Sequence, residues 1–429
     1  MILVKKVHAR QILDSRGNPT VEVVLVSDSS VGVGAVPSGA STGKYESVEL
    51  RDSSSKDYFG KSVKSAINNV NRTICKKIVG RDFASQKDFD ECLIRLDGTQ
   101  NKSVLGANAI LGCSLAFARA FTASKQGHLF QYFNHLSHHS QNFSLPIPFA
   151  NVINGGVHAG TDLVFQEFMV VPFGAKSFAQ ATQMVVEIYN TLKLIIRQVY
   201  GVNATNVGDE GGFVPPIKTP DQALTLLRKA TKKAGYSGKV GFAIDVAASE
   251  FYNPNQSKYF LSSSKSYSSV QLVKFYESLV AKYPEIVSIE DPFDQDDFYG
   301  WKTLNESLGK KILIVGDDLT VSNLLRITTA SENNLCNTLL LKLNQIGSVT
   351  QGVVAAKYAR SLGWNVIVSH RSGETEDPFI SDLAVGLGCG MIKLGAPARA
   401  ERTAKYNQLL RLEEFLFKKA KFASLSMLR

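Results

Sequence analysis

The chain has 429 residues, of which 44% are hydrophobic and 20% charged, the balance of a folded protein with a large core and not of a disordered chain. Its net charge of +10 is carried by lysines and arginines spread in ones and twos without interleaved aromatic residues, so we expect a solvated basic surface and no nucleic-acid partner. The sequence has no run of 18 apolar residues, no secretory leader and no C-x-x-C pair among its five cysteines, which predicts a cytoplasmic protein with reduced thiols and no membrane span.

The first third of the chain predicts a small α+β domain. Residues 4–37 indicate a three-stranded meander, because apolar stretches are interrupted by the turn sequences DSRGNP and DSS. Residues 62–132 then follow a helical period. The polar segment 135–144, followed by two prolines, predicts a linker. We therefore divide the chain into an N-terminal α+β capping domain, 1–140, and a C-terminal α/β barrel domain, 141–429.

Eight short apolar segments after the linker predict buried strands by their length and their β-branched residues. They are FANVIN, EFMVVPF, GFAIDV, IVSIED, ILIVGD, TLLLKL, NVIVSH and MIKLG. The first two are not separated by a helix, whereas two helical stretches, 177–200 and 220–234, precede the third. The pattern predicts an irregular eight-stranded barrel of the order ββαα(βα)₆.

A polar or charged residue stands at or near the end of each of the last six strands. These residues are Asp245, Glu290, Asp317, Lys342, His370 and Lys393. From Glu290 onward they recur every 23 to 28 positions, the length of one strand, one helix and two loops. One such residue would be an ordinary strand-end charge, but six in succession indicate an active site, because barrel enzymes keep their chemistry at the C-terminal ends of the strands.

Three of the six residues are acids that would meet at neighbouring strand ends. Carboxylate oxygens in that number suit Mg²⁺, which keeps further positions open for substrate oxygens. Taken singly, Asp245, Glu290 or Asp317 is more simply a salt-bridged or capping side chain. Taken together, three converging acids would repel one another without a cation. The trio therefore predicts a magnesium site.

Two of the six residues are lysines within otherwise apolar strands. A buried lysine is costly unless it is paired, so a functional role for Lys342 and Lys393 is favoured over a pair of lysines that reach out to solvent. Beside a second cation and a metal ion, the pKa of Lys342 is expected to be lowered, which would make this amine available as a base.

Further polar groups lie in loops. His370, Arg371 and Ser372 follow a strand in a glycine-containing loop, a composition that suits phosphate binding. The glycine-rich segments 157–168 and 206–216 carry His158, Glu167 and Glu210, each unremarkable alone.

The loop at 37–46 matches neither common nucleotide-binding motif. Ser38 and Tyr45 stand where Walker A requires Gly and Ser or Thr, and the preceding glycines miss the dinucleotide pattern. What remains is a small, hydroxyl-rich loop that suits closure over a ligand.

Long motifs along the whole chain resemble the enolase family. They are ILDSRGNPTVEV, PSGASTG, DGTQNKSVLGANAILG, ATNVGDEGGF, IDVAASEF, SIEDPFDQDD, VGDDLTV, LKLNQIGS, SHRSGETED and RTAKYNQLLRLEE. The resemblance implies a carbon–oxygen lyase that reversibly dehydrates 2-phosphoglycerate to phosphoenolpyruvate, with two Mg²⁺ ions in each active site. Enolase-type enzymes are a known example of a lysine or histidine base working beside Mg²⁺.

The resemblance also implies a role for each matching residue. The implied catalytic residues are Lys342 as the base, Glu210 as the acid, and Glu167, His158 and His370. The implied substrate-binding residues are His158, Glu167, Lys342, Arg371, Ser372 and Lys393. The implied metal ligands are Asp245, Glu290 and Asp317 for the first Mg²⁺ and Ser41 for the second.

Enolases are typically dimers, so the resemblance implies a homodimer. The residues that match its interface are Arg10, Glu22, Arg411 and Glu414. The residues that depart from the family pattern are Thr161, Asp162, Leu394 and Ala400. Two alternatives stay open: a related barrel enzyme that acts on another, non-phosphorylated carboxylate, and a secondary surface-binding or structural role of the same fold.

Overall fold

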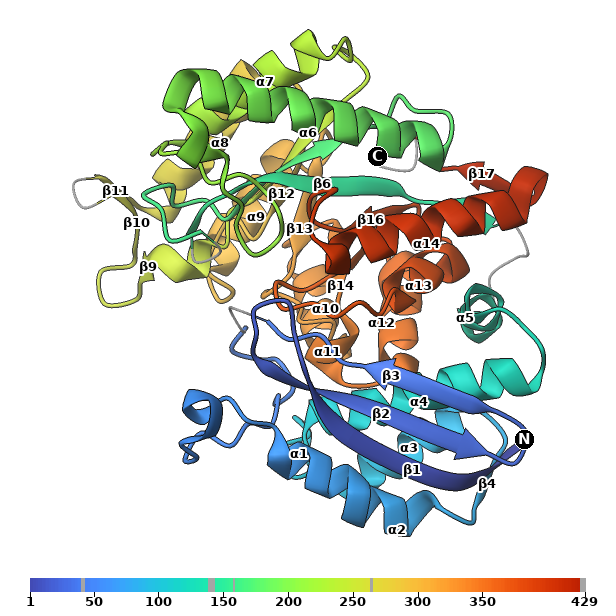
Figure 1. Cartoon of the computed structure of the whole chain (residues 1–429). Helices are drawn as coiled ribbons and strands as arrows, with labels where there is room; N and C mark the ends of the chain where they lie inside the picture. The colour runs from blue at the N-terminus through green and yellow to red at the C-terminus, as the bar shows by residue number, and fades with distance from the viewer. Residues whose placement is uncertain (40–42, 138–142, 157–158, 263–264, 425–429) are drawn as a thin grey trace.

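The computed structural model of the chain describes residues 1–39, 43–137, 143–156, 159–262 and 265–424. A small N-terminal sheet with its helices lies below an eight-stranded barrel surrounded by helices (Figure 1). Both parts of the predicted fold class are therefore confirmed. The predicted boundary at residue 140 falls in 138–142, outside the described residues, and the division into 1–140 and 141–429 stays a prediction.

The N-terminal part has an antiparallel sheet of the order β3-β2-β1-β4. Its strands are β1 (Ile2–Leu13), β2 (Pro19–Ser27), β3 (Val31–Ala35) and β4 (Asp82–Phe83). The first three are the predicted meander, and the two-residue β4 is an addition that the sequence pattern did not indicate. Its helices are η1 (Asp57–Gly60), α1 (Lys64–Asn68), η2 (Asn69–Ile74), α2 (Cys75–Ile78), α3 (Gln86–Asp97), α4 (Ala107–Ser124) and α5 (Leu129–Ser137).

Helix α4 joins the sheet to the rest of the molecule. The helix is apolar on nearly all sides and almost wholly buried, as expected of an element covered from every direction. Strand β3 approaches it closely, since a Cβ atom added at Gly32 would lie 1.9 Å from the carbonyl oxygen of Ala116. The glycine is thus required for this packing.

The barrel closes in the order β12-β13-β14-β15-β16-β6-β7-β8. Its strands are β6 (Ile147–Asn154), β7 (Glu167–Val171), β8 (Gly241–Asp245), β12 (Ile286–Glu290), β13 (Leu313–Gly316), β14 (Thr338–Leu341), β15 (Asn365–Ser369) and β16 (Met391–Lys393). All eight predicted segments form these strands. Strand β7 runs antiparallel to both neighbours, as its short connection from β6 requires, and the other pairs are parallel. The irregular ββαα(βα)₆ barrel is confirmed.

Helices cover the outside of the barrel. They are α6 (Phe178–Tyr200), η4 (Val202–Thr205), α7 (Pro220–Lys233), η5 (Ala248–Phe251), α8 (Ser269–Lys282), α9 (Phe298–Leu308), α10 (Leu324–Glu332), α11 (Leu343–Ile346), α12 (Val349–Ser361), α13 (Phe379–Leu387), α14 (Ala400–Leu416) and η6 (Phe417–Lys419). Small additional strands are β5 (Phe143–Leu145), which pairs with β17 (Ala420–Phe422), and the sheet of β9 (Tyr252–Asn253), β10 (Lys258–Ser262) and β11 (Lys265–Tyr267).

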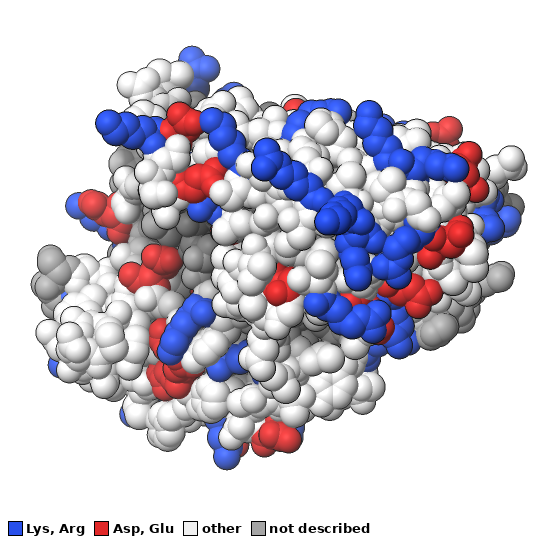
Figure 2. Space-filling model, turned by 90° about the horizontal axis from the view of Figure 1, so that it is seen from below, with Lys and Arg blue, Asp and Glu red and all other residues white. Residues whose placement is uncertain are grey.

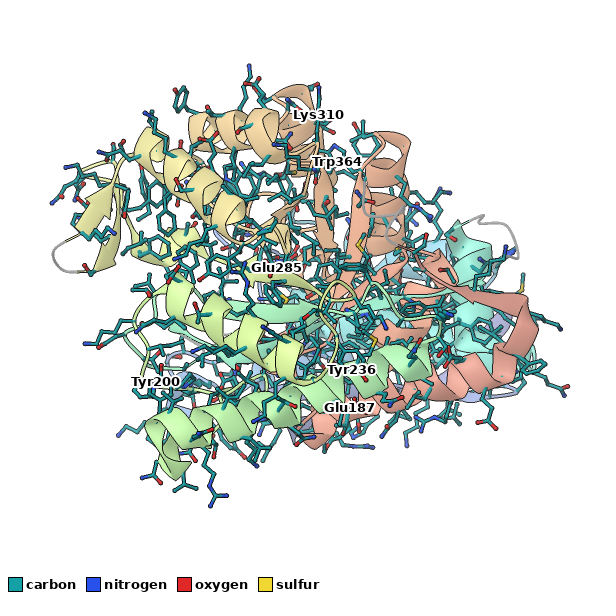
Figure 3. The ribbon with its side chains drawn as sticks, turned by 90° about the horizontal axis from the view of Figure 1, so that it is seen from above. Glu187, Tyr200, Tyr236, Glu285, Lys310 and Trp364 are labelled. Carbon is teal, nitrogen blue, oxygen red and sulfur yellow. The ribbon has the colours of Figure 1, made fainter. Side chains whose placement is uncertain are left out.

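The two ends of the barrel differ in what they carry. Figure 3 shows Tyr236, Glu285, Lys310 and Trp364 on the face seen from above, and each lies in a loop that precedes a barrel strand. The predicted site residues follow the strands, at the opposite end. This end faces the N-terminal domain, because the segment after β3 contacts loops that follow barrel strands.

Charge on the surface is mixed. Figure 2 shows lysines and arginines lying among acidic and uncharged residues on the face seen from below. Among the described residues, no helix is long and apolar enough to cross a membrane. The expectation of a basic surface without a nucleic-acid partner stays a prediction.

Candidate active site

One pocket collects most of the predicted site residues. It is lined by Gln166, Glu167, Glu210, Asp245, Asp317, Lys342, Ser369, His370, Arg371, Ser372 and Lys393. The residues come from the start of β7, from the C-terminal ends of β8, β13, β14, β15 and β16 or the loops that follow them, and from the turn that carries Glu210. Two further predicted residues, Ser41 and His158, lie outside the described residues.

Lys393 lies between three buried carboxylates. Its Nζ atom is 2.8 Å from Oε1 of Glu290, 3.0 Å from Oδ2 of Asp245 and 3.2 Å from Oε2 of Glu167. Burial alone would lower the pKa of Lys393, but the carboxylates outweigh burial and hold this pKa well above its ordinary value. Burial and the neighbouring acids raise the pKa of Glu167 and of Glu290 well above the ordinary value. The ammonium therefore offsets the mutual repulsion of this group.

Lys342 is held by Asp317. The distance from Nζ to Oδ2 is 2.5 Å, and Gln345 donates from Nε2 to the other carboxylate oxygen, Oδ1, at 2.8 Å. Burial would lower the pKa of Lys342, but the Asp317 charge outweighs it, and the net direction is upward. The expected lowering is therefore wrong for the side chains as arranged here. Neighbouring cations do lower the pKa of Lys342, but the ion pair with Asp317, which the sequence pattern does not indicate, has the larger effect.

Two acids beside this pair were missed in the sequence. Asp291 and Asp318 each directly follow an acid that was selected, Glu290 or Asp317. The Asp291 carboxylate accepts the backbone N–H of Asp317 at 2.9 Å and of Asp318 at 2.8 Å. Burial, together with the charge of Asp317, raises the pKa of Asp318 to about 8.

The donor set fits a hard divalent cation. In the part of the chain that the structure describes, three possible ligand atoms lie within 4.8 Å of one another in two groups: Asp291, Asp317 and Asp318, and Glu167, Glu210 and His370. Neither group is the predicted trio. Lys393 Nζ lies between Asp245 and Glu290, while Asp317 pairs with Lys342. Burial and the charges of neighbouring acids raise the pKa values of Glu290 and Asp318, and a Mg²⁺ ion bound among these carboxylates would offset both effects.

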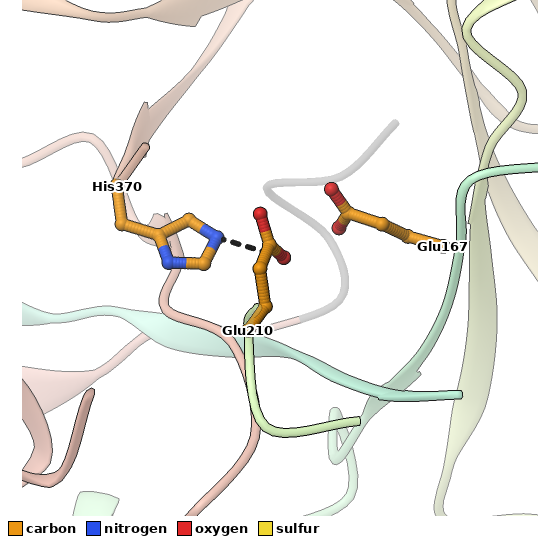
Figure 4. Close-up of side chains that lie close together, drawn as sticks. All are labelled: Glu167, Glu210 and His370. Carbon is orange, nitrogen blue, oxygen red and sulfur yellow. Dashed lines mark ion pairs between the residues drawn. The ribbon is translucent and has the colours of Figure 1, made fainter. Parts of the chain in front are cut away.

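Glu210 and His370 form the second group, with Glu167 facing them (Figure 4). Oε2 of Glu210 accepts a hydrogen bond from Nδ2 of Asn151 at 3.0 Å and lies 3.3 Å from Nε2 of His370. Burial lowers the pKa of His370 to about 3, so the imidazole is neutral. The turn that presents Glu210 is fixed by Tyr189, whose hydroxyl donates to the carbonyl oxygen of Gly211 at 2.7 Å.

The predicted phosphate residues are buried and tied to the N-terminal domain. Arg371 is 5% and Ser372 is 4% exposed, and the Arg371 guanidinium lies 3.2 Å from the Glu46 carboxylate. Ser38 and Gly373 exchange two backbone hydrogen bonds, of 2.7 and 2.9 Å. The segment after β3 is thereby fastened to the loop after β15, so this part of the pocket is built from both domains.

The same segment reaches other loops. Tyr45 donates from its hydroxyl to Asp296 at 2.9 Å, and the guanidinium of Arg326 lies 4.1 Å from the centre of the Tyr45 ring. The backbone N–H of Ser47 donates to the carbonyl oxygen of Gln345 at 2.8 Å. These contacts fix the described residues that follow Ser41 in the chain, and the Ser38–Gly373 pair fixes those that precede it.

The residues expected at a dimer interface lie on the surface. Arg10 and Glu22 are cross-strand partners of β1 and β2 and form an ion pair of 2.6 Å within the chain. Arg411 and Glu414 are exposed on α14. Their accessibility is compatible with an interface, and the dimer stays a prediction.

The four residues that depart from the family pattern do not line the pocket. Leu394 is fully buried in the core outside the barrel lumen, and Asp162 pairs with Lys218 at 3.0 Å on the surface. Ala400 begins α14.

Comparison with known proteins agrees with this geometry. Residues 4–133 match the model of the enolase N-terminal domain, and residues 142–429 match that of the enolase C-terminal TIM barrel domain. The chain is also similar to an enolase of Mastigamoeba balamuthi, with 52% identity over 433 residues that cover 99% of this chain and 98% of the relative. The chain belongs to the enolase family, the Mg²⁺-dependent hydro-lyases that convert 2-phosphoglycerate to phosphoenolpyruvate in glycolysis.

Proposed function

We propose that two separate groups of side chains divide this reaction between them. Lys342 removes the proton from C2 of 2-phosphoglycerate, and Glu210 protonates the hydroxyl that leaves C3. The supporting observation is that both residues line one pocket but belong to different clusters, Lys342 with Asp317 and Glu210 with His370. A base and an acid with separate partners can hold different protonation states at one pH. The charge of Asp317 holds the pKa of Lys342 up in this arrangement, and a cation bound to Asp317 would offset that charge and let the amine act as a base.

Lys393 stabilises the negative charge that builds up on the substrate after proton removal. Its ammonium is buried, fixed by three carboxylates and kept protonated, which is what a preorganised charge requires. Glu167 contacts Lys393 and supports the acid Glu210 from the other side of the pocket. Arg371 and Ser372 bind the phosphate, since a guanidinium pairs well with phosphate oxygens. His158 and His370 are the remaining residues to which the family resemblance gives a role in the reaction.

Asp245, Glu290 and Asp317 hold one Mg²⁺, and Ser41 ligates a second. When bound, the two ions supply Lewis-acid stabilisation of the charge on the substrate carboxylate. Asp318, whose carboxylate lies within 4.8 Å of those of Asp291 and Asp317, is an additional candidate ligand. We also propose a cytoplasmic homodimer with Arg10, Glu22, Arg411 and Glu414 at the interface, and the domain division 1–140 and 141–429.

The experiment follows each half of the reaction separately. In D₂O, NMR of the 2-phosphoglycerate pool measures exchange of the C2 proton, and formation of phosphoenolpyruvate measures complete dehydration. Lys342→Ala should lose both by a factor on the order of 10²–10⁴, the usual contribution of a general base. Glu210→Gln should retain exchange and lose dehydration, because the amide cannot give up a proton to the hydroxyl.

The matched control is Lys310→Ala. Lys310 is an exposed lysine in the loop before β13, at the end of the barrel away from the pocket (Figure 3). Its variant should keep both activities. Exchange that survives in Lys342→Ala, or disappears in Glu210→Gln, would show that the roles are assigned to the wrong residues.

A further inference from the structure

Arg402, near the start of α14, contacts His370 of the active site but does not itself line the pocket. The residue is 0% exposed. Its guanidinium lies 2.7 Å from Nδ1 of His370 and donates to the carbonyl oxygens of Arg371 at 2.5 Å, Ser372 at 2.5 Å and Asp209 at 3.1 Å. One buried cation therefore joins the loop that presents the phosphate residues to the turn that presents Glu210.

We propose that Arg402 is a positioning residue that fixes His370 as its Nε2–H tautomer and thereby directs the acid proton of Glu210 toward the substrate. The proposal rests on the role of Glu210 proposed above.

The tautomer follows from the donor chemistry of the two groups. A guanidinium has only N–H donors, so Nδ1 of His370 must accept with its lone pair. A neutral imidazole carries one proton, which must then reside on Nε2. The doubly protonated form is excluded, because burial, aided by the Arg402 charge, lowers the pKa of His370 to about 3. Arg402 thus leaves His370 with a single donor, and that donor faces Glu210.

The tautomer decides which oxygen of Glu210 carries the proton. Oε2 accepts from Asn151 and faces Nε2–H of His370, so two donors converge on this oxygen. A third proton on Oε2 would be crowded by both, and the acid proton is placed on Oε1. In the opposite tautomer, Nε2 would offer a lone pair to Glu210. The acid proton would then be drawn into a hydrogen bond with His370 and away from the leaving hydroxyl.

The other contacts of Arg402 preserve this arrangement. Its bonds to the carbonyl oxygens of Arg371 and Ser372 fix the backbone on the C-terminal side of His370, and its bond to Asp209 fixes the residue before Glu210. The donor to His370 and the position of Glu210 are therefore set by the same guanidinium. A change at Arg402 should act on the acid step more than on Lys342, which is held by Asp317.

The first test observes the tautomer directly in the wild-type protein. In protein labelled with ¹⁵N-histidine, the nitrogen shifts of a neutral imidazole distinguish the protonated from the unprotonated ring nitrogen, and His370→Gln assigns the signal. We expect an unprotonated Nδ1 and a protonated Nε2. A protonated Nδ1 in the wild type would overturn the proposal, and this measurement requires no variant to fold.

The second test compares substitutions of two buried cations on α14. Arg402→Met removes every donor to His370, whereas Arg402→Lys keeps one. Lys405→Met is the matched control: Lys405 is also 0% exposed, but its ammonium contacts Glu374 and the carbonyl oxygen of Thr375. We expect Arg402→Met to shift the His370 population toward Nδ1–H, and Arg402→Lys and Lys405→Met to retain Nε2–H. An unchanged tautomer in folded Arg402→Met would refute the assignment.

The kinetic test separates positioning from a general loss of structure. In Arg402→Met, exchange of the C2 proton should persist while phosphoenolpyruvate formation falls on the order of 10²-fold, and Arg402→Lys should recover part of the loss. An equal fall of both steps would mean that Arg402 only supports the fold. The NMR result does not depend on the role of Glu210. A tautomer change without a kinetic split would therefore refute the link to Glu210, whereas failure of the Glu210→Gln test alone would refute the proposed acid.

Discussion

Replacing Lys393 by methionine removes an ammonium from between three buried carboxylates while keeping a long side chain. In the wild type, Nζ lies 2.8 to 3.2 Å from Glu290, Asp245 and Glu167, and all four side chains are less than 5% exposed. Removing one partner of a buried ion pair destabilises a protein by about 3–5 kcal/mol. Because three acids share this cation and repel one another, we expect the upper end of that range, about 5 kcal/mol at pH 7 in the presence of EDTA.

Two conditions should reduce the loss. Mg²⁺ stabilises any folded state that binds it, by about 2.7 kcal/mol at 100 times the dissociation constant, and the difference from wild type shrinks because carboxylates no longer paired with Lys393 should bind the ion more tightly. Acid should also help. The pKa values of Glu167 and Glu290 are raised in the folded protein, so the stability linked to their protonation is present below their ordinary pKa near 4.5 and is lost as pH rises through the folded values. Lowering the pH toward 5 should therefore narrow the gap between variant and wild type.

Urea unfolding of the two proteins measures these differences. Tryptophan fluorescence is a suitable signal, since Trp301 is fully buried. The titrations would be run in EDTA and in Mg²⁺, at pH 7 and pH 5, with Lys310→Met as the control for loss of an exposed lysine. A difference below about 1 kcal/mol between Lys393→Met and wild type in EDTA at pH 7 would refute the reasoning that this ammonium offsets the carboxylate charge.

Lys102→Met should have the opposite effect and stabilise the protein by about 3 kcal/mol at pH 7, because Lys102 is 1% exposed and burial lowers its pKa from 10.5 to about 8. The unfolded chain then binds more protons than the folded one, so wild-type stability should rise between pH 8 and pH 10 and that of the variant should not; parallel pH slopes in urea titrations would contradict this. Glu22→Lys should weaken the homodimer by placing like charges beside Arg10, with sedimentation velocity as the measurement, and a wild-type monomer at micromolar concentration would disprove the dimer. Excess EDTA should abolish dehydration and added Mg²⁺ should restore it, whereas full turnover in EDTA would exclude the magnesium requirement.

The strand period explains how much of the site could be read from the sequence. In a barrel, the residue at the C-terminal end of each strand faces the same opening, so Asp245, Lys342 and Lys393 could be assigned to one pocket from spacing alone. The ion pairs that these side chains form with one another could not be assigned from spacing. The contact of Lys342 with Asp317 depends on side-chain length and rotamer across two strands, and this contact reverses the expected direction of the Lys342 pKa.

Three residues near the site, Asp318, Gln166 and Arg402, were not selected from the sequence, for two reasons. Asp318 and Gln166 each stand next to a selected acid, and strict alternation along a strand would point one member of each pair away from the pocket. Both lie just outside a strand, where alternation no longer applies; Gln166 lines the pocket, and the Asp318 carboxylate lies within 4.8 Å of that of Asp317. Arg402 was missed because an arginine in the first turn of a helix is usually a surface charge. Here the loop after β15 and the turn before α7 cover it completely.

The closure of the barrel has a consequence for how the chain is made. Strand β6 pairs on one side with β7, which follows it shortly, and on the other with β16, whose Met391 pairs with Ile147. During translation, β6 and β7 can form a hairpin early, but the free edge of β6 has no native neighbour until β16 has left the ribosome. An unpaired edge is a template for wrong pairing. We therefore expect the nascent barrel to depend on chaperones until β16 has been synthesised and can pair with β6.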